Sequence, residues 1–297
     1  MPITAKVIAD STANFIRITS ITIKAPMFLD AEFEKHRRLS NVSSNSSSNR
    51  AIPFVKMLDQ GYFLPADIRL NQPGMQGDLL LDEDSKEQFW NTLRDVYGYT
   101  ADKLKQWDKV HKQHLNRYLS GFYWQNKICT ATEWDNFWNL RVHPDADPAM
   151  YEVAKCMKEA MDSSIPVELK PGEWHLPYVD KEVETPSKSR FDRLKCSVAR
   201  CARLSYDNHD GTFSSIENDL DLFGALVIRP YTNKKGKVFT KDDPIHASPT
   251  EHQATPMKYT LGYDATAFEE PGVTHIDRDG YTWSGNFRGW IQYRQLL

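Results

Sequence analysis

Side chains able to bind phosphate are concentrated between residues 35 and 50. Lys35, His36 and Arg37 are followed by Ser40 and by a Ser/Asn-rich run that ends at Arg50. Serine hydroxyls and exposed backbone N–H groups can surround an oxyanion, and arginine adds a bidentate charged contact. A flexible linker is the alternative interpretation of this composition. Because apolar segments continue directly on both sides of the run, we favour a phosphate-binding surface.

The segment 133–141, E-W-D-N-F-W-N-L-R, has the apolar spacing of an amphipathic helix. Its residues at i, i+3, i+4 and i+7 share one helix face, and they are Trp134, Phe137, Trp138 and Arg141. This pattern predicts a core helix with Arg141 at its rim. Asn136 precedes Arg141 by about 140° of rotation around an ideal helix. The two side chains would therefore serve different ligands or different copies of a site, which indicates a site assembled between subunits.

The segment 246–252, H-A-S-P-T-E-H, gathers two histidines and a glutamate. Composition alone suggests a metal site, but the spacing of His246, Glu251 and His252 differs from the H-E-x-x-H helix. Pro249 also argues against a regular helix here. We therefore expect no metal. Polar contacts to a cofactor and an ordinary capped turn are the two interpretations left open.

Cysteine chemistry is not indicated by the sequence. The four cysteines form no C-x-x-C pair, which argues against structural zinc, and they are Cys129, Cys156, Cys196 and Cys201. Cys201 lies in A-R-C-A-R-L-S-Y (199–206), where no neighbouring residue is an evident base, so a buried thiol is expected. Cysteine scarcity suits a reducing compartment.

These segments together resemble the flavin-dependent thymidylate synthase family, ThyX. The family signature reads R-H-R, two residues, S, one residue, N, two residues, S, one residue, R. Here K-H-R-R-L-S (35–40) is followed by N-S-S-S-N-R (45–50). Four further blocks are similar to family blocks, namely A-P-M-F-L (25–29), N-F-W-N-L-R (136–141), A-R-L-S-Y-D (202–207) and H-A-S-P-T-E-H (246–252). The last two come first in the family's usual order, so the sequence resembles a circularly permuted, bacteriophage-type member.

The sequence also departs from the family pattern. Lys35 replaces the first arginine of the signature, and extra residues lengthen the serine run. Glu32 stands where the family has glutamine, and Thr132 where it has arginine at the start of the helix. Lysine does not reproduce a bidentate arginine contact. Arg294, near the end of the sequence, is a candidate for the missing charge.

The resemblance implies a reaction and a set of site residues. Reduced FAD would supply hydride, methylenetetrahydrofolate the one-carbon unit and NADPH the reducing power, for methylation of dUMP or a related pyrimidine deoxynucleotide at carbon 5. The residues implied to hold FAD are His36, Arg37, Asn136, His246, Ser248 and Glu251. Those implied to hold the nucleotide are Glu32, Ser48, Arg50, Arg117 and Arg141. Arg141 is the implied catalytic residue, which polarises the uracil.

Two alternatives stay open beside this reaction. Water in place of hydride would give a hydroxymethylated pyrimidine nucleotide on the same scaffold. The chain could instead bind flavin or nucleotide without catalysis. The family also implies a homotetramer with FAD sites between subunits.

The elements that position these residues follow from the apolar pattern. Alternation predicts a strand at 15–24. Apolar spacing predicts helices at 27–37, over much of 85–126, at 150–161 and around 215–228. A further helix is expected to begin near Thr130, where Thr130 and Glu133 fit a capping box. An exposed hairpin or loop is expected at 231–245, and a final helix at 285–294.

These elements indicate an α/β (α+β) protein, for which the family implies an antiparallel sheet with long helices and permuted halves. We expect one catalytic domain over 1–297, with a first half 1–167, a connector 168–195 and a second half 196–297.

Composition limits the class of protein. The 297 residues are 40% hydrophobic, which suffices for a substantial core. A net charge of −3 provides no global basic field for a nucleic acid polymer, so phosphate binding must be local. The first residues lack a signal peptide's apolar core, and no apolar run approaches the length of a membrane span. We expect a cytoplasmic protein, in the host cytoplasm if it is viral, with no membrane partner.

Overall fold

The computed structural model describes residues 2–35, 42–73, 77, 79–179, 189–205, 214–261 and 265–297. His36, Arg37 and Ser40 of the expected phosphate-binding run lie outside the described residues, as do Tyr206 and Asp207. The chain combines helices with several sheets, so the fold class is mixed α and β, of the α+β kind.

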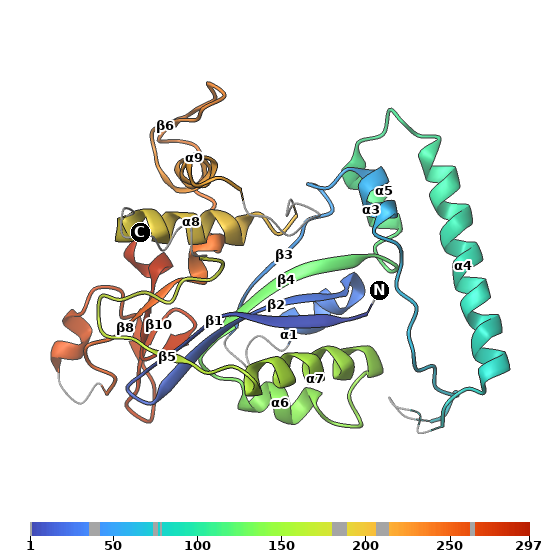
Figure 1. The fold of residues 1–297 in the computed structure, drawn as a ribbon, viewed down its shortest axis with the longest axis horizontal. Helices are drawn as coiled ribbons and strands as arrows, with labels where there is room; N and C mark the ends of the chain where they lie inside the picture. Colours follow the sequence, from blue (N-terminus) through green and yellow to red (C-terminus); the bar gives the residue numbers. More distant parts are fainter. Residues whose placement is uncertain are drawn as a thin grey trace.

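A five-stranded sheet forms the middle of the protein in the order β3-β4-β2-β1-β5 (Figure 1). β1 (Thr4–Ala13) and β2 (Ile16–Pro26) form a long hairpin, in which β-branched residues recur along both strands. β4 (Trp124–Ala131) pairs antiparallel with β2 and with the edge strand β3 (Ser43–Ser46). β5 (Val167–Glu168) adds to β1 in parallel. The strand expected from alternation is confirmed as β2.

Helices cover both faces of this sheet. α6 (Asp135–Arg141) and α7 (Pro148–Asp162) pack on the face that carries Cys129. Side chains alternate between faces along a strand, so Ile128 points to the other face, where it packs against α8 (Arg190–Ala202). Figure 1 shows α6 and α7 on one side of the sheet and α8 on the other.

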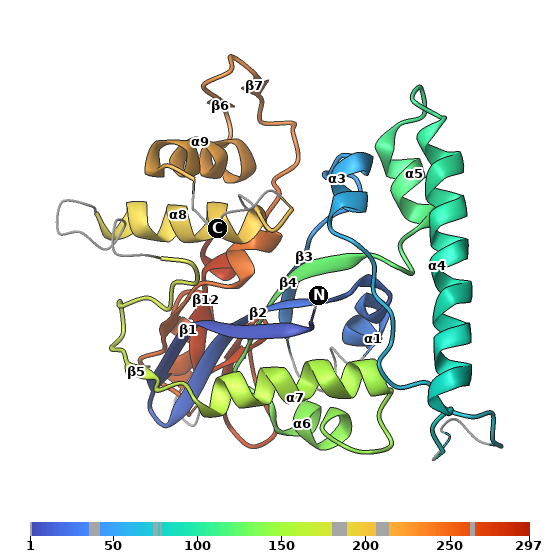
Figure 2. The same ribbon diagram turned by 45° about the vertical axis from the view of Figure 1, so that its right-hand side comes forward.

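A second core lies at one end of the molecule. It is built from α3 (Phe54–Asp59), α4 (Glu83–Lys105) and α5 (Lys112–Tyr118), around a fully buried Tyr123. α4 stands beside the body of the protein rather than over the sheet (Figure 2). The helical stretch expected over 85–126 is interrupted, because the chain turns into β4 after Tyr123.

The C-terminal region packs against the turn end of the β1–β2 hairpin. β8 (Ala254–Pro256) pairs with β12 (Trp290–Gln292). The indole of Trp290 is fully buried, and its Nε1 donates to the Ile16 carbonyl at 3.2 Å. Three short strands form a further antiparallel sheet: β9 (His275–Ile276), β10 (Thr282–Ser284) and β11 (Phe287–Arg288).

Several expected elements are confirmed by the structure. These are η1 (Met27–Leu29) with α1 (Asp30–Lys35), α7, α9 (Ile216–Val227), and a hairpin made of β6 (Tyr231–Thr232) and β7 (Val238–Phe239). In each case the apolar spacing or the turn residues within the segment itself are sufficient to predict the element.

The final helix expected at 285–294 is wrong. This stretch forms β11, β12 and the short helix η4 (Tyr293–Leu296). Gly285 and Gly289 have φ of 57° and 70°, a left-handed conformation that an α-helix does not contain. A Cβ on Gly289 would lie 2.5 Å from Ile16 Cδ1, so the glycine also permits close packing on the hairpin.

The capping box expected at Thr130 and Glu133 is also wrong. Thr130 is fully buried inside β4, and α6 begins only at Asp135 without a side-chain cap. The connector expected at 168–195 is partly helical, because Ser189 Oγ accepts from the N–H of Asp192 and starts α8.

Candidate functional site

The edge strand of the central sheet carries only hydroxyl and amide side chains. β3 has the sequence S-S-N-S and runs antiparallel to β4. The run continues along β4, where the Ser47 N–H donates to the Asn126 carbonyl at 2.8 Å and the Asn126 N–H to Ser47 Oγ at 3.1 Å. Residues 43–47 of the Ser/Asn-rich run therefore lie along the edge of the sheet, where they present polar groups.

The turn that follows β3 is held in place by α5. Asn116 is fully buried, and its Nδ2 donates to the carbonyls of Asn49 at 2.8 Å and Ile52 at 3.0 Å. Lys112 Nζ donates to the Ala51 carbonyl at 2.5 Å. One helix thus satisfies three carbonyl oxygens of a turn that would otherwise depend on solvent.

This arrangement brings three of the expected nucleotide-binding residues to adjoining elements. Ser48 and Arg50 lie on the turn, and Arg117 follows Asn116 on α5. All three side chains are exposed. Two guanidinium groups and a hydroxyl on neighbouring elements can bind an anion.

Replacing Asn116 with alanine is expected to lower the free energy of unfolding by about 1 to 3 kcal/mol, because two carbonyls lose their buried donor. Urea denaturation measures this change. His114→Ala, on an exposed position of the same helix, is the matched control and is expected to change stability by less than about 0.5 kcal/mol. Equal effects of the two substitutions would show that Asn116 does not hold the turn.

The end of α8 reaches the same turn. Ser205 Oγ accepts from the Ser48 N–H at 2.7 Å, and the two residues are 157 positions apart in the sequence. Asn126 Nδ2 also donates to the Leu204 carbonyl at 3.5 Å. The A-R-L-S block therefore contacts the Ser/Asn-rich run. No local sequence pattern in either segment predicts this contact.

The H-A-S-P-T-E-H segment lies beside β3. Its centre forms the short helix η2 (Ser248–Glu251). Gln292 links the two elements, because its Nε2 donates to Ser43 Oγ at 3.0 Å and to the Glu251 carbonyl at 2.9 Å. His246 and Ser248 are exposed, and the side chain of Glu251 is partly buried. Polar side chains of this segment are thus available next to the edge strand.

Two arginines from the C-terminal region lie near these elements. Arg294 Nη1 is 3.6 Å from a carboxylate oxygen of Glu251. The backbone N–H of Arg288 donates to Thr132 Oγ1 at 3.1 Å, and its Nη2 lies 2.6 Å from Glu133 Oε1. Burial raises the pKa of Glu133, and the charge of Arg288 opposes this rise. Arg288 therefore lies beside Thr132, and Arg294 lies beside Glu251.

α6 places Asn136 and Arg141 on the opposite face of the sheet from α8. Trp134 and Phe137 are buried against the sheet, which confirms the predicted core face of this helix. Asn136 is exposed, and Arg141 is the last residue of the helix. Within one chain, α6 is thus separated by the sheet from η2, which packs beside α8.

α1 is fixed next to β3 by a buried charge. Lys127 is almost fully buried in β4, and its Nζ lies 2.7 Å from Asp30 Oδ1. Ser46 Oγ donates to the same oxygen at 3.0 Å. Glu32 lies on α1, two residues beyond Asp30, and is partly buried. The helix that carries the expected substrate residue Glu32 therefore lies near the edge strand, on the α6 face of the sheet.

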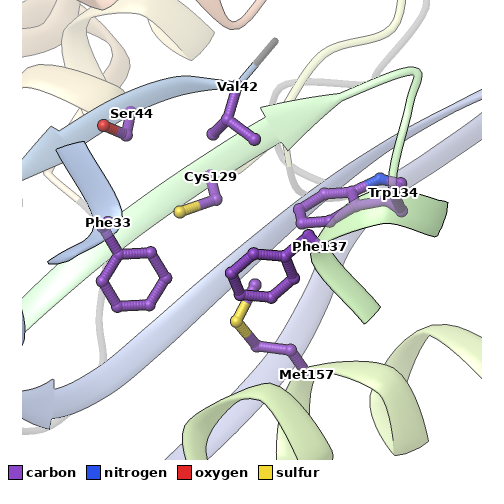
Figure 3. Close-up of a pocket in the computed structure, with 7 residues that line it drawn as sticks. All are labelled: Phe33, Val42, Ser44, Cys129, Trp134, Phe137 and Met157. Carbon is purple, nitrogen blue, oxygen red and sulfur yellow. The ribbon is translucent and has the colours of Figure 1, made fainter. Parts of the chain in front are cut away.

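A small cavity lies beneath β3, between α1, β4, α6 and α7 (Figure 3). Its volume of about 10 Å³ is near the least that admits one water molecule. Figure 3 shows aromatic rings around the space, with the sulfur of Cys129 close to them. The lining residues are Phe33, Val42, Ser44, Cys129, Trp134, Phe137 and Met157. We interpret the cavity as a small packing void between α6 and the sheet.

A chain of buried hydroxyls and imidazoles runs across one face of the sheet, over β1, β2 and β4, to the end of η2. Ser11 Oγ is 2.9 Å from His175 Nδ1, and His175 Nε2 is 2.8 Å from Ser20 Oγ. Ser20 Oγ is 2.6 Å from Thr130 Oγ1, which is 2.9 Å from His252 Nδ1. Burial lowers the pKa of both histidines to about 3, so both are neutral. Nε2 of His252 has no hydrogen-bond partner within the described structure.

Three residues that shape the site carry little signal in the sequence. Gln292 and Arg288 act on residues more than a hundred positions away, so no local pattern reveals them. Asn116 adjoins Arg117, and its only sequence signal is that proximity.

Metal and membrane features can be stated for the described residues alone. Within that part of the chain, no group of three His, Cys, Asp or Glu residues could hold a metal ion. None of its helices combines the length and the apolar character needed to cross a bilayer.

Comparison with known proteins gives a limited similarity. No protein-family model matches the sequence, and no curated protein matches it. Among solved structures, the UMP/dUMP methylase PolB from Streptomyces cacaoi bound with 5-Br UMP is similar at a TM-score of 0.46 and 14% identity, over 54% of this chain and 88% of that chain. The same methylase bound with 5-Br dUMP gives 0.44 and 16%, over 54% and 90%. The function of this chain is therefore argued from its own residues.

Proposed function

We propose that this protein is a flavin-dependent thymidylate synthase of the ThyX type, which methylates dUMP at carbon 5 with methylenetetrahydrofolate and reduced FAD. The proposal includes a single catalytic domain with permuted halves, a homotetramer, NADPH as reductant and a cytoplasmic location.

The observation that carries the proposal is the meeting of distant sequence blocks around β3. The bond from the Ser48 N–H to Ser205 joins the serine run to the A-R-L-S block. Gln292 joins β3 to η2, which belongs to the H-A-S-P-T-E-H block. Blocks that are similar to family motifs are far apart along this chain, so their gathering at one edge is not a local effect of sequence.

The residues beside β3 fit a polar cofactor. His246 and Ser248 are exposed next to a hydroxyl-rich strand, and the partly buried Glu251 adds a carboxylate. The Nε2 atom of His252, at the end of η2, is buried without a partner in the described structure. His246, Ser248 and Glu251 would hold FAD, together with Asn136 and the undescribed His36 and Arg37, in a site between subunits. FAD, when bound, supplies the hydride for the methyl group.

The chain's own residues have binding and electrostatic roles in this proposal. Ser48, Arg50 and Arg117 would bind the phosphate of the nucleotide, because a hydroxyl and two guanidiniums can share one oxyanion. Glu32 would contact the nucleotide from α1. Arg141 would polarise the uracil from a neighbouring subunit, since the sheet separates it from η2 within one chain.

Anaerobic turnover tests the proposal directly. Purified protein is supplied with dUMP, methylenetetrahydrofolate, FAD and NADPH, and the product is identified by mass spectrometry. Formation of dTMP, with a yellow protein that NADPH bleaches, is the expected result. A hydroxymethylated product from dUMP or dCMP would assign the alternative reaction, and absence of any product would leave a binding role.

Replacing Arg141 with alanine is expected to lower kcat by about 100-fold or more, because the charge that polarises the reacting ring is lost. Nucleotide affinity is expected to fall as well, whereas the flavin absorbance of the purified protein is retained. Arg278→Ala, at a position that is almost fully exposed, is the control and should turn over normally. Normal turnover by the Arg141 variant would remove this residue from the site.

A further inference from the structure

The first residue of α1 carries a carboxylate whose two oxygens have different surroundings. Oδ1 of Asp30 lies 2.7 Å from Lys127 Nζ, and it accepts hydrogen bonds from Ser46 Oγ at 3.0 Å and from Gln125 Nε2 at 3.4 Å. Oδ2 accepts no hydrogen bond from any residue that the structure describes. The Asp30 side chain is 42% exposed. One oxygen is therefore anchored to the sheet, and the other is open to a ligand.

The group that anchors this carboxylate is a buried lysine. Lys127 is 1% exposed within β4, and its ammonium group also lies 5.2 Å from the centre of the Phe33 ring. A buried ion pair contributes little net stability, because the desolvation of its charges offsets their attraction. Well-packed apolar residues of similar volume often stabilise such a contact equally well. Holding α1 on the sheet therefore does not by itself require a lysine, whereas orienting the Asp30 carboxylate does.

Asp30 lies between two segments that carry expected nucleotide-binding residues. Glu32 is two residues further along α1. Ser46, which donates to Asp30, comes two residues before Ser48, and two residues of extended chain span roughly 7 Å. A mononucleotide whose phosphate is bound at Ser48 can therefore place its sugar or its base beside the open oxygen of Asp30.

A carboxylate oxygen accepts hydrogen bonds and repels phosphate, so the open oxygen suits the uncharged part of a nucleotide. We propose that Asp30 Oδ2 accepts a hydrogen bond from the nucleoside of the bound pyrimidine nucleotide, either from a sugar hydroxyl or from a ring N–H. The carboxylate is held in the orientation for this contact by Lys127, Ser46 and Gln125. This inference rests on the proposed function, because it takes the nucleotide site beside β3 as given.

Replacing Asp30 with asparagine tests the contact. Asparagine keeps one oxygen for the three groups at Oδ1 but puts an NH2 group in place of Oδ2, so the donor of the nucleotide meets another donor. The dissociation constant for dUMP, measured by isothermal titration calorimetry, is expected to rise at least about 10-fold. Asp162→Asn, which alters an exposed pair with Lys158 on α7, is the matched control and should bind dUMP normally. Unchanged affinity of Asp30→Asn overturns the inference.

Two analogues of dUMP identify the donor. The first, 2′,3′-dideoxyuridine monophosphate, lacks the sugar hydroxyl, and the second, dUMP methylated at N3, lacks the ring N–H. The parent protein is expected to bind one of them at least about 10-fold more weakly than dUMP. Asp30→Asn is expected to bind that analogue and dUMP with equal affinity, because the contact is already absent. If the variant discriminates against both analogues as strongly as the parent protein does, Asp30 contacts neither group and the inference is wrong.

The double variant Asp30→Asn with Lys127→Met separates binding from folding. It buries no unpaired charge, so its Tm is expected to lie within about 3 °C of that of the parent protein. Its affinity for dUMP is expected to stay at least about 10-fold weaker, because methionine restores packing but not the acceptor. Parent-like affinity of this double variant would contradict the inference alone. A parent protein that binds no dUMP would overturn the proposed function and the inference together.

Discussion

Lowering the pH from about 7.5 to about 5.0 is expected to reduce the free energy of unfolding by roughly 4 kcal/mol through two buried histidines. Burial lowers the pKa of His175 and of His252 from the ordinary 6.5 to about 3 in the folded protein. The unfolded chain therefore takes up protons below pH 6.5 that the folded chain excludes. Their contribution to stability is complete above pH 6.5 and is lost as the pH falls from 6.5 towards 3, by roughly 2 kcal/mol for each histidine at pH 5.

Urea denaturation at a series of pH values measures this loss. His252→Gln is expected to reduce its slope with pH by about half, since one of the two groups no longer titrates. His114→Gln is the control, because His114 is exposed on α5. The explanation fails if the His252 variant and the parent protein lose the same stability between these pH values.

Replacing Asp219 with alanine is expected to lower the free energy of unfolding by about 3 to 5 kcal/mol. Its two carboxylate oxygens accept from Arg200 Nε at 2.8 Å and from Arg203 Nε at 3.2 Å. The side chains of Asp219 and Arg200 are 0% and 2% exposed. Burial raises the pKa of Asp219, and the two guanidiniums act in the opposite direction. The substitution leaves a buried guanidinium without its counter-charge, at the contact between α8 and α9.

A surface ion pair on the same helix provides the comparison. Glu217 lies 2.7 Å from Lys234 but its side chain is 81% exposed, so Glu217→Ala is expected to cost less than about 1 kcal/mol. The double variant Arg200→Met with Asp219→Leu should be more stable than Asp219→Ala, because it buries no charge. Thermal and urea denaturation of the three variants measure these differences. A similar cost for Asp219→Ala and Glu217→Ala would contradict the assigned role of the buried pair.

Local patterns of the sequence predict much of the secondary structure. β2, α7 and α9 follow from apolar spacing within a few turns or a few alternations. Thr130 shows why other elements cannot be predicted this way. A capping box and a buried strand position are both consistent with its neighbours, and the strand is selected by hydroxyl contacts to Ser20 and His252, which are far away in sequence. Tertiary partners of this kind are invisible to a local pattern.

The candidate site likewise combines features that the sequence predicts with features that depend on tertiary contacts. Composition predicts an anion-binding run that contains Ser48 and Arg50, and the family resemblance adds Arg117. The adjoining placement of the three residues depends on Asn116. The charge beside Thr132 comes from Arg288, whose approach is fixed by the C-terminal strands rather than by any spacing near residue 132. The sequence therefore predicts which kinds of side chain bind an anion, whereas only the fold shows which arginine lies at a given position of the site.

The hydroxyl–imidazole chain across one face of the sheet restricts the tautomers of its two histidines. Its four contacts link Ser11, His175, Ser20, Thr130 and His252 in single file. Each hydroxyl has one proton to donate, so all four bonds form only if every donor points the same way. If His252 carries its proton on Nδ1, it donates to Thr130, and His175 must then also carry its proton on Nδ1. If Nδ1 of His252 has no proton, it accepts from Thr130, and both histidines then carry their protons on Nε2. A ligand that donates to or accepts from Nε2 of His252 would therefore set the direction of the hydroxyl at Ser11, on the far side of two strands.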